Sequence, residues 1–217
     1  MPRRSRNLAI ALAAVAVVVV AAAVIVIAPG SGRHSSSAGA SSSVSAGPET
    51  GFDGASFPVG RPTPEFTLTD QYGRRVSLGQ YRGQVVALTF LYSTCGDTCI
   101  VIAEQIRGAL DELQAEGARP PAVLIVSADP AADSPAHVRS FLSQVSLSAR
   151  VQYLTGSLSQ LRSVWRAYGI KPASDGTAVF DEYAPVLLLD RAGRKRVLFE
   201  SEELTPEALS HDVRKLD

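Results

Sequence analysis

Cysteine, methionine, tryptophan and histidine are all scarce in this chain. Its 217 residues include two cysteines, one methionine, one tryptophan and three histidines. Two cysteines can form only a single bridge, so a small fold held together by several disulfides is excluded. An excess of either charge is missing too, because 21 lysines and arginines balance 21 aspartates and glutamates. Nucleic-acid binding usually needs a basic surface, so we predict no nucleic-acid partner.

One long apolar run stands near the N-terminus. Leu8 to Ala28 contains 21 consecutive apolar residues, and a helix of that length spans about 30 Å, the thickness of a bilayer core. Three arginines precede the run, which favours a cytoplasmic N-terminus. We therefore expect residues 1–7 to be a cytoplasmic basic tail, residues 8–28 a single transmembrane anchor in the cell membrane, and the remainder extracytoplasmic. The alternative is a cleaved signal peptide, whose apolar region is usually about 7–15 residues long and which would also export the domain.

The anchor is followed by a segment of different composition. Residues 29–57 are rich in serine, glycine and alanine and show no apolar period, which predicts a flexible tether. A coil of that size reaches on the order of 30 Å, so the domain could meet a partner on the same membrane. Residues 58–217 show no internal repeat and are long enough for one domain with its own core.

Strand and helix patterns alternate in this domain. Residues 64–78 predict a β-hairpin around the turn DQYG, and residues 85–92 predict a buried strand. Apolar residues at helical spacing follow, with a stop at Gly117, and residues 122–126 predict a second buried strand. The later elements are expected as a helix opened by Ser134 and Pro135, a strand at 151–154, a helix capped by Ser157, strands at 185–189 and 197–199, and a last helix from Thr205. This order predicts a mixed α/β sheet covered on both faces.

The two cysteines fall between a strand and the start of a helix. Cys95 and Cys99 are four residues apart, so on a helix they share one face at a Cα separation that suits a disulfide. A helix N-terminus lowers the pKa of nearby thiols and so favours thiol–disulfide exchange. We assign attack on a partner to Cys95 and resolution of the mixed disulfide to Cys99. The alternative is a static structural bridge, although so short a loop gives little entropic benefit.

The domain resembles the Sco/SenC proteins, thioredoxin-fold factors that support copper-centre assembly in cytochrome oxidase. The resemblance covers residues 64–199 and depends on five segments in order, FTLTDQYGRRVSL, TFLYSTCGDTC, VSADP, DSPAHVRSFL and YLTGSLSQLRSVWRAYGI. It implies a thioredoxin-like fold with an N-terminal hairpin, a mixed central sheet and flanking helices. The spacing of three residues between the cysteines is the most specific feature, because thioredoxin and its reductase relatives have two.

Several positions depart from the family pattern. Gly96 and Ile100 stand where the family usually has a proline after each cysteine. The third copper ligand of the family is a histidine shortly before the penultimate strand, and here Glu182 falls nearest its place. Ala184-Pro185 resembles the cis-proline segment of thioredoxins, and Pro185, if its bond is cis, would present neighbouring backbone to a substrate chain.

These observations favour a membrane-anchored thiol–disulfide oxidoreductase that needs no cofactor. Its expected partners are thiols or disulfides of exported proteins, with a cytochrome oxidase subunit as a candidate. The alternative is a chaperone that delivers Cu(I) to that oxidase on Cys95 and Cys99, because thiolates suit Cu(I), whereas Glu182 offers a hard oxygen. A second alternative is a redox-inactive binding domain with a structural disulfide. A peroxidase ranks lower, because Tyr92 stands where that chemistry usually has a threonine.

Overall fold

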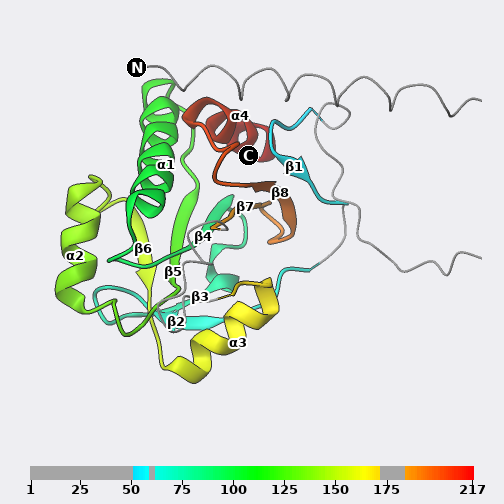
Figure 1. Ribbon diagram of the computed structural model, residues 1–217. Helices are drawn as coiled ribbons and strands as arrows, with labels where there is room; N and C mark the ends of the chain where they lie inside the picture. The colour runs from blue at the N-terminus through cyan, green and yellow to red at the C-terminus, as the bar shows by residue number, and fades with distance from the viewer. Residues whose placement is uncertain (1–50, 59–61, 172–183) are drawn as a thin grey trace, which may run out of the picture. The chain divides into compact units, whose positions relative to one another are not determined.

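The computed structural model of the protein describes residues 51–58, 62–171 and 184–217. Over these residues the chain forms a six-stranded mixed sheet and a separate two-stranded hairpin (Figure 1). Within the same residues, no helix has both the length and the apolar character needed to cross a bilayer. The apolar run at 8–28, expected to be the anchor, lies outside the described residues.

The sheet has the strand order β1-β8-β7-β4-β5-β6. Its strands are β1 (Ala55–Ser56), β4 (Val86–Leu91), β5 (Ala122–Ser127), β6 (Val151–Leu154), β7 (Val186–Leu189) and β8 (Lys195–Phe199). Strands β4, β5 and β6 are parallel, whereas β7 runs antiparallel to both β4 and β8. Every side chain of β4, β5 and β7 is buried, as expected for strands covered on both faces. The predicted mixed α/β sheet is confirmed.

In the part of the chain that the structure describes, four α-helices flank the sheet. They are α1 (Asp97–Ala115), α2 (Pro135–Gln144), α3 (Leu158–Tyr168) and α4 (Pro206–Leu216). The hydroxyls of Ser134, Ser157 and Thr205 each accept a backbone N–H in the first turn, so the predicted starts of α2, α3 and α4 are confirmed. In Figure 1, α1 and α4 lie together on one side of the sheet and α3 lies on the other.

The hairpin consists of β2 (Thr67–Thr69) and β3 (Arg75–Ser77), followed by the short 3-10 helix η1 (Leu78–Tyr81). It packs beside α3, where the Phe66 ring meets the Tyr168 ring edge to face at 6.1 Å between centroids. Leu68 and Val76 point inward and are buried. The hairpin predicted over residues 64–78 is therefore confirmed.

The folded domain begins earlier than residue 58, the boundary expected from composition. Strand β1 pairs antiparallel with β8, and Phe52 is buried. The carboxylate of Asp212 on α4 accepts the backbone N–H groups of Asp53 and Gly54 at 2.9 and 3.0 Å. A strand of two residues has no alternating pattern that a sequence could display, so its pairing depends on these distant partners.

Candidate functional site

The two cysteines are joined by a disulfide, with their Cα atoms 5.8 Å apart. Cys95 lies in the loop that leaves β4, and Cys99 lies in the first turn of α1. The loop makes a turn in which the Cys95 N–H donates to the Tyr92 carbonyl at 3.2 Å. The strand-to-helix junction therefore brings the sulfurs within bonding distance, as the spacing predicts.

The two sulfur-bearing residues differ in their access to solvent. Cys95 is 6% exposed, whereas Cys99 is fully buried at 0%. Both residues are therefore largely buried, and Cys95 is the more accessible of the two, which favours it as the residue that meets a partner. Helix α1 begins at Asp97 after a glycine at the cap position, Gly96, which has no side chain to satisfy the first N–H groups. These N–H groups and the positive end of the helix dipole favour thiolates once the bridge is reduced.

Pro185 does not have the geometry that the sequence suggested. The described residues contain no cis peptide bond, so the bond between Ala184 and Pro185 is trans. The trans form is the ordinary preference of a proline bond, and it leads the chain directly into the extended strand β7, which starts at Val186. The structure therefore does not show the cis bond on which the role of Pro185 in presenting backbone to a substrate chain depended. Glu182, expected at the place of the family histidine, lies outside the described residues.

A buried carboxylate that the sequence analysis did not single out lies behind the cysteine loop. Asp133 accepts the backbone N–H of Ser93 at 2.6 Å, the hydroxyl of Ser127 at 2.6 Å and the hydroxyl of Tyr153 at 2.8 Å. Burial raises the pKa of Asp133, and the hydrogen bonds from Ser127 and Ser93 oppose that shift. The three donors come from the carboxyl ends of β4, β5 and β6. In the sequence, the only local feature that points to Asp133 is its position directly before the helix-capping residue Ser134.

The same network reaches α3. The indole Nε1–H of Trp165 donates to the Ser127 carbonyl at 2.9 Å, and both residues are buried. Trp165 is thus part of the core. The carboxylate of Asp129, in the loop between Ser127 and Asp133, accepts the nearby N–H groups of Ala131 and Ala132, and the Asp129 carbonyl accepts the Asp133 N–H at 3.1 Å. Its role is to shape the local turn, which is the role that an Asp-Pro pair predicts.

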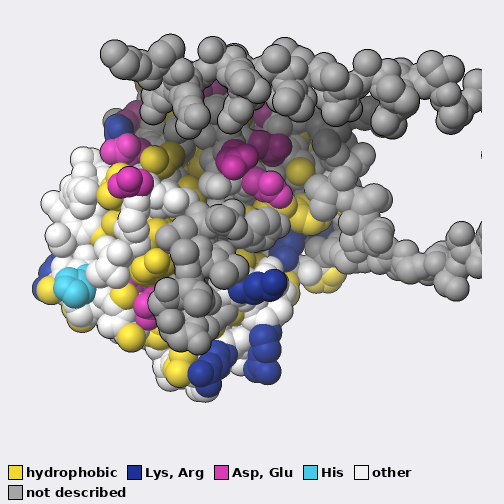
Figure 2. All heavy atoms as spheres, in the orientation of Figure 1, with side chains coloured by type: hydrophobic (Ala, Val, Ile, Leu, Met, Phe, Trp, Pro, Cys, Tyr) yellow, Lys and Arg dark blue, Asp and Glu magenta, His cyan; other side chains and the backbone are white. Residues whose placement is uncertain are grey.

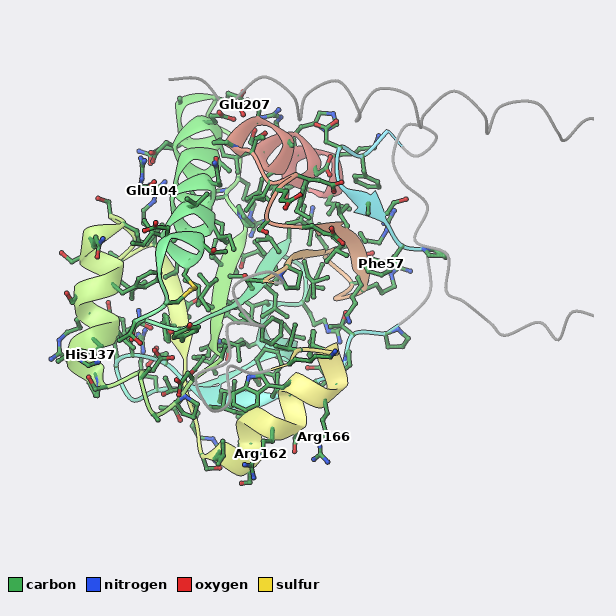
Figure 3. All side chains as sticks on the ribbon, viewed as in Figure 1. Phe57, Glu104, His137, Arg162, Arg166 and Glu207 are labelled. Atoms are coloured by element: carbon green, nitrogen blue, oxygen red, sulfur yellow. A yellow bond between two sulfur atoms is a disulfide. The ribbon has the colours of Figure 1, made fainter. Side chains whose placement is uncertain are left out.

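No described histidine, aspartate or glutamate forms a candidate metal-binding group with the two cysteines. The group of described side chains that could hold a metal is Asp53, His211 and Asp212, which contains neither cysteine. His137 is exposed on α2, where its Nδ1 lies 2.9 Å from the Ala132 carbonyl, and Figure 3 shows its ring at the outer edge of the domain. In the bonded state the sulfurs are not thiolates, so this form does not suit Cu(I).

Charged side chains are distributed unevenly over the face of the domain that Figure 2 shows. Figure 2 shows acidic side chains over the side that carries α1 and α4, and basic side chains over the side that carries α3. Glu104 and Glu207 belong to the first set, and Arg162 and Arg166, which point outward from α3 in Figure 3, belong to the second.

A family model described as SCO1/SenC matches residues 59–216. Among curated proteins, the mitochondrial SCO2 homolog of Bos taurus is 32% identical over 107 residues, which cover 49% of this chain and 40% of that protein. The chain spans about half the length of the curated relatives that it matches.

Two solved structures have the same fold. The structure of BsSco, described as a member of the Sco family of cytochrome c oxidase assembly proteins, has a TM-score of 0.64 and 22% identity, covering 73% of this chain and 95% of its own. Copper-bound ScoI of Bradyrhizobium japonicum has a TM-score of 0.56 and 27% identity, covering 72% of this chain and 100% of its own. The thioredoxin-like fold implied by the resemblance is thereby confirmed. Because the family model spans the hairpin, the cysteine loop and all four helices, the chain belongs to the SCO1/SenC family.

Proposed function

We propose that this protein is a membrane-anchored, extracytoplasmic thiol–disulfide oxidoreductase of the Sco/SenC type. The observation that carries the proposal is the bonded pair at the start of α1, in which Cys95 is the less deeply buried residue. A helix N-terminus favours the thiolate that such exchange requires.

The exchange moves two electrons in two substitution steps. In the reduced protein, the Cys95 thiolate attacks one sulfur of a partner disulfide, forms a mixed disulfide and releases the other partner sulfur as a thiolate. The Cys99 thiolate then attacks the Cys95 sulfur, which closes the Cys95–Cys99 bridge and releases the second partner thiolate. The partner gains the two electrons that the pair loses. An external dithiol reduces the bridge by the same steps, and the reverse sequence oxidises a partner dithiol.

The proposed partner is a thiol-containing copper site of cytochrome oxidase. Membership in a family that includes cytochrome c oxidase assembly proteins supports this choice. A copper site with cysteine ligands accepts metal only when its thiols are reduced. A dithiol on a tethered domain would keep the cysteine ligands of such a site reduced, so that they can bind copper. The expected anchor at residues 8–28 would keep this protein and the oxidase on the same membrane.

A second candidate is the transfer of Cu(I) itself. The copper-bound structure of Bradyrhizobium japonicum ScoI favours it, since that protein shares the fold at 27% identity. Reduced Cys95 and Cys99 would supply two soft thiolates. We rank this candidate second, because in the sequence Glu182, and no histidine, falls nearest the place of the family's histidine ligand.

Trapping a partner tests the redox proposal. The Cys99→Ser variant keeps the attacking sulfur but cannot resolve a mixed disulfide, so it should accumulate a covalent adduct with a model oxidase peptide that contains a disulfide. Cys95→Ser is the matched control and should form no adduct. A reduction potential of the wild-type pair below about −300 mV, with no adduct in Cys99→Ser, would indicate an inert structural bridge instead.

Copper retention separates the two candidates. The reduced full-length protein would be loaded with Cu(I) and passed over a desalting column, together with Cys95→Ser and Glu182→His. We expect weak retention by the wild type and stronger retention by Glu182→His, because imidazole is a better ligand for copper than carboxylate. Stoichiometric retention by the wild type would place copper transfer first.

A further inference from the structure

We propose that Asp133 is a positioning residue that holds the cysteine loop and sets the reduction potential of the Cys95–Cys99 pair. The inference rests on the redox function proposed above and concerns a residue outside the pair. It starts from the contact between Asp133 Oδ1 and the Ser93 N–H at 2.6 Å, a hydrogen bond that joins residues 40 positions apart in the sequence.

This hydrogen bond acts directly on the loop that carries the reactive sulfur. Ser93 lies inside the turn that the Cys95 N–H closes on the Tyr92 carbonyl. The Ser93 hydroxyl also lies 3.4 Å from the Ala132 carbonyl, so the loop is tied to the Asp133 segment at two points. Because the N–H of Ser93 lies between the end of β4 and Cys95, fixing it restricts where the Cys95 sulfur can be.

The carboxylate is itself held in place. Its other oxygen, Oδ2, accepts the hydroxyls of Ser127 and Tyr153, and both of those residues are fully buried. The Ser127 carbonyl is in turn held by the Trp165 indole. Asp133 is 7% exposed, so water competes little for these hydrogen bonds. Asp133, which holds the cysteine loop, is therefore itself held by residues of the central strands β5 and β6.

Restricting Cys95 raises the effective concentration of one sulfur beside the other, which favours the bridge over the dithiol. Loss of the hydrogen bond should therefore weaken the bridge and raise the reduction potential. One hydrogen bond to a charged group typically contributes about a tenfold factor or more. For a two-electron couple, a tenfold factor corresponds to about 30 mV.

The test is the equilibrium of the full-length protein, in mild detergent, with a glutathione redox buffer. Asp133→Ala should reduce the equilibrium constant for bridge formation about tenfold, and Asp133→Asn, which keeps a neutral acceptor, about threefold. Asp129→Ala is the matched control, because it removes a carboxylate from the same loop that accepts only local N–H groups. It should leave the constant within about twofold of the wild type.

The outcomes separate this inference from the proposed function. A folded Asp133→Ala protein with the wild-type constant, or an equal shift in Asp129→Ala, would overturn the positioning role and leave the redox function standing. If Asp133→Ala does not fold, Asp133→Asn decides, and an unchanged constant there would overturn the role. The equilibrium constant should also shift in Asp133→Ala at a pH below the thiol pKa, where both thiols are protonated. If the shift disappears there, the positioning role is overturned, because the effect would then come from the Asp133 charge acting on the cysteine thiolates. Failure of the wild-type pair to exchange at all would instead contradict the proposed function.

Discussion

Asp70 and Asp190 hold two different hairpin turns through the same set of hydrogen bonds. Asp70 accepts the backbone N–H and the Nε–H of Arg74, both at 2.8 Å, and Asp190 accepts the corresponding groups of Arg194 at 2.9 and 3.0 Å. Burial raises the pKa of each carboxyl, but the hydrogen bonds from the arginine outweigh burial and lower the pKa below its usual value. Both turns therefore depend on an ionised carboxylate.

We expect these two turns to make the protein sensitive to acid. Because the folded-state pKa of each carboxyl is lowered, its contribution is complete above the unfolded pKa of about 3.9 and is lost as the pH falls through the folded-state pKa. Urea unfolding followed by circular dichroism across that range should show the loss. The double variant Asp70→Asn, Asp190→Asn should be less stable at neutral pH and should change less in acid.

Asp133→Asn provides a control with the opposite sign. Burial raises the pKa of Asp133, so its titration adds stability as the pH falls from the raised pKa toward about 3.9. Asp133→Asn lacks this titrating carboxyl, so its free energy of unfolding should decline more steeply in acid than that of the wild type. An acid slope that is the same in all three proteins would contradict the assignment of these carboxyls.

Gly108 allows α1 and α4 to approach closely. A Cβ atom at this position would lie 2.8 Å from Pro206 Cγ and 3.0 Å from Pro206 Cβ, and the proline ring cannot rotate away. In an exposed helix, Gly→Ala usually stabilises by about 1 kcal/mol. Here we expect Gly108→Ala to destabilise by about 1–3 kcal/mol, because the two helices must separate. Urea unfolding measures the change, and a stabilised variant would show that the helices separate without cost.

The Cys95–Cys99 disulfide should stabilise the fold less than disulfides that close longer loops do. Cys95 and Cys99 close a loop of five residues, for which loop entropy predicts about 2 kcal/mol. Urea unfolding of the oxidised and reduced wild type should therefore differ by about that amount, with both forms folded. Cys95→Ala, Cys99→Ala should resemble the reduced form. If the reduced protein were unfolded, the pair could not cycle as proposed and the bridge would be structural.

Residues 8–28 should hold the protein in the membrane. We expect the full-length chain to remain with membranes after extraction with high salt and alkali, and to be released by detergent. Deleting residues 1–28 should yield a protein that fractionates with the soluble material. Release of the full-length chain by alkali alone would contradict the anchor, and a shortened chain after export would indicate cleavage of a signal peptide.

The local parts of the fold were predictable from the sequence, because each depends on neighbours in the chain. The hairpin turn at Asp70 and the cap at Ser157 are signals carried within four residues, and the structure confirms both. The bond between Cys95 and Cys99 is equally local, since their spacing at a helix start suits a bridge. The order of strand and helix patterns also predicted the mixed sheet.

Other features depended on contacts between distant parts of the chain. The sequence by itself determined where the elements are and which two residues form the pair, because hydrophobic period, capping and spacing act over a few residues. Only the tertiary structure decided that β1 joins the sheet beside β8, that Pro185 enters β7 through a trans bond, and that Asp133 lies under Ser93. Asp133 collects donors from β5, from β6 and from the loop after β4, which lie side by side only after the sheet has formed, and no local pattern specifies that arrangement.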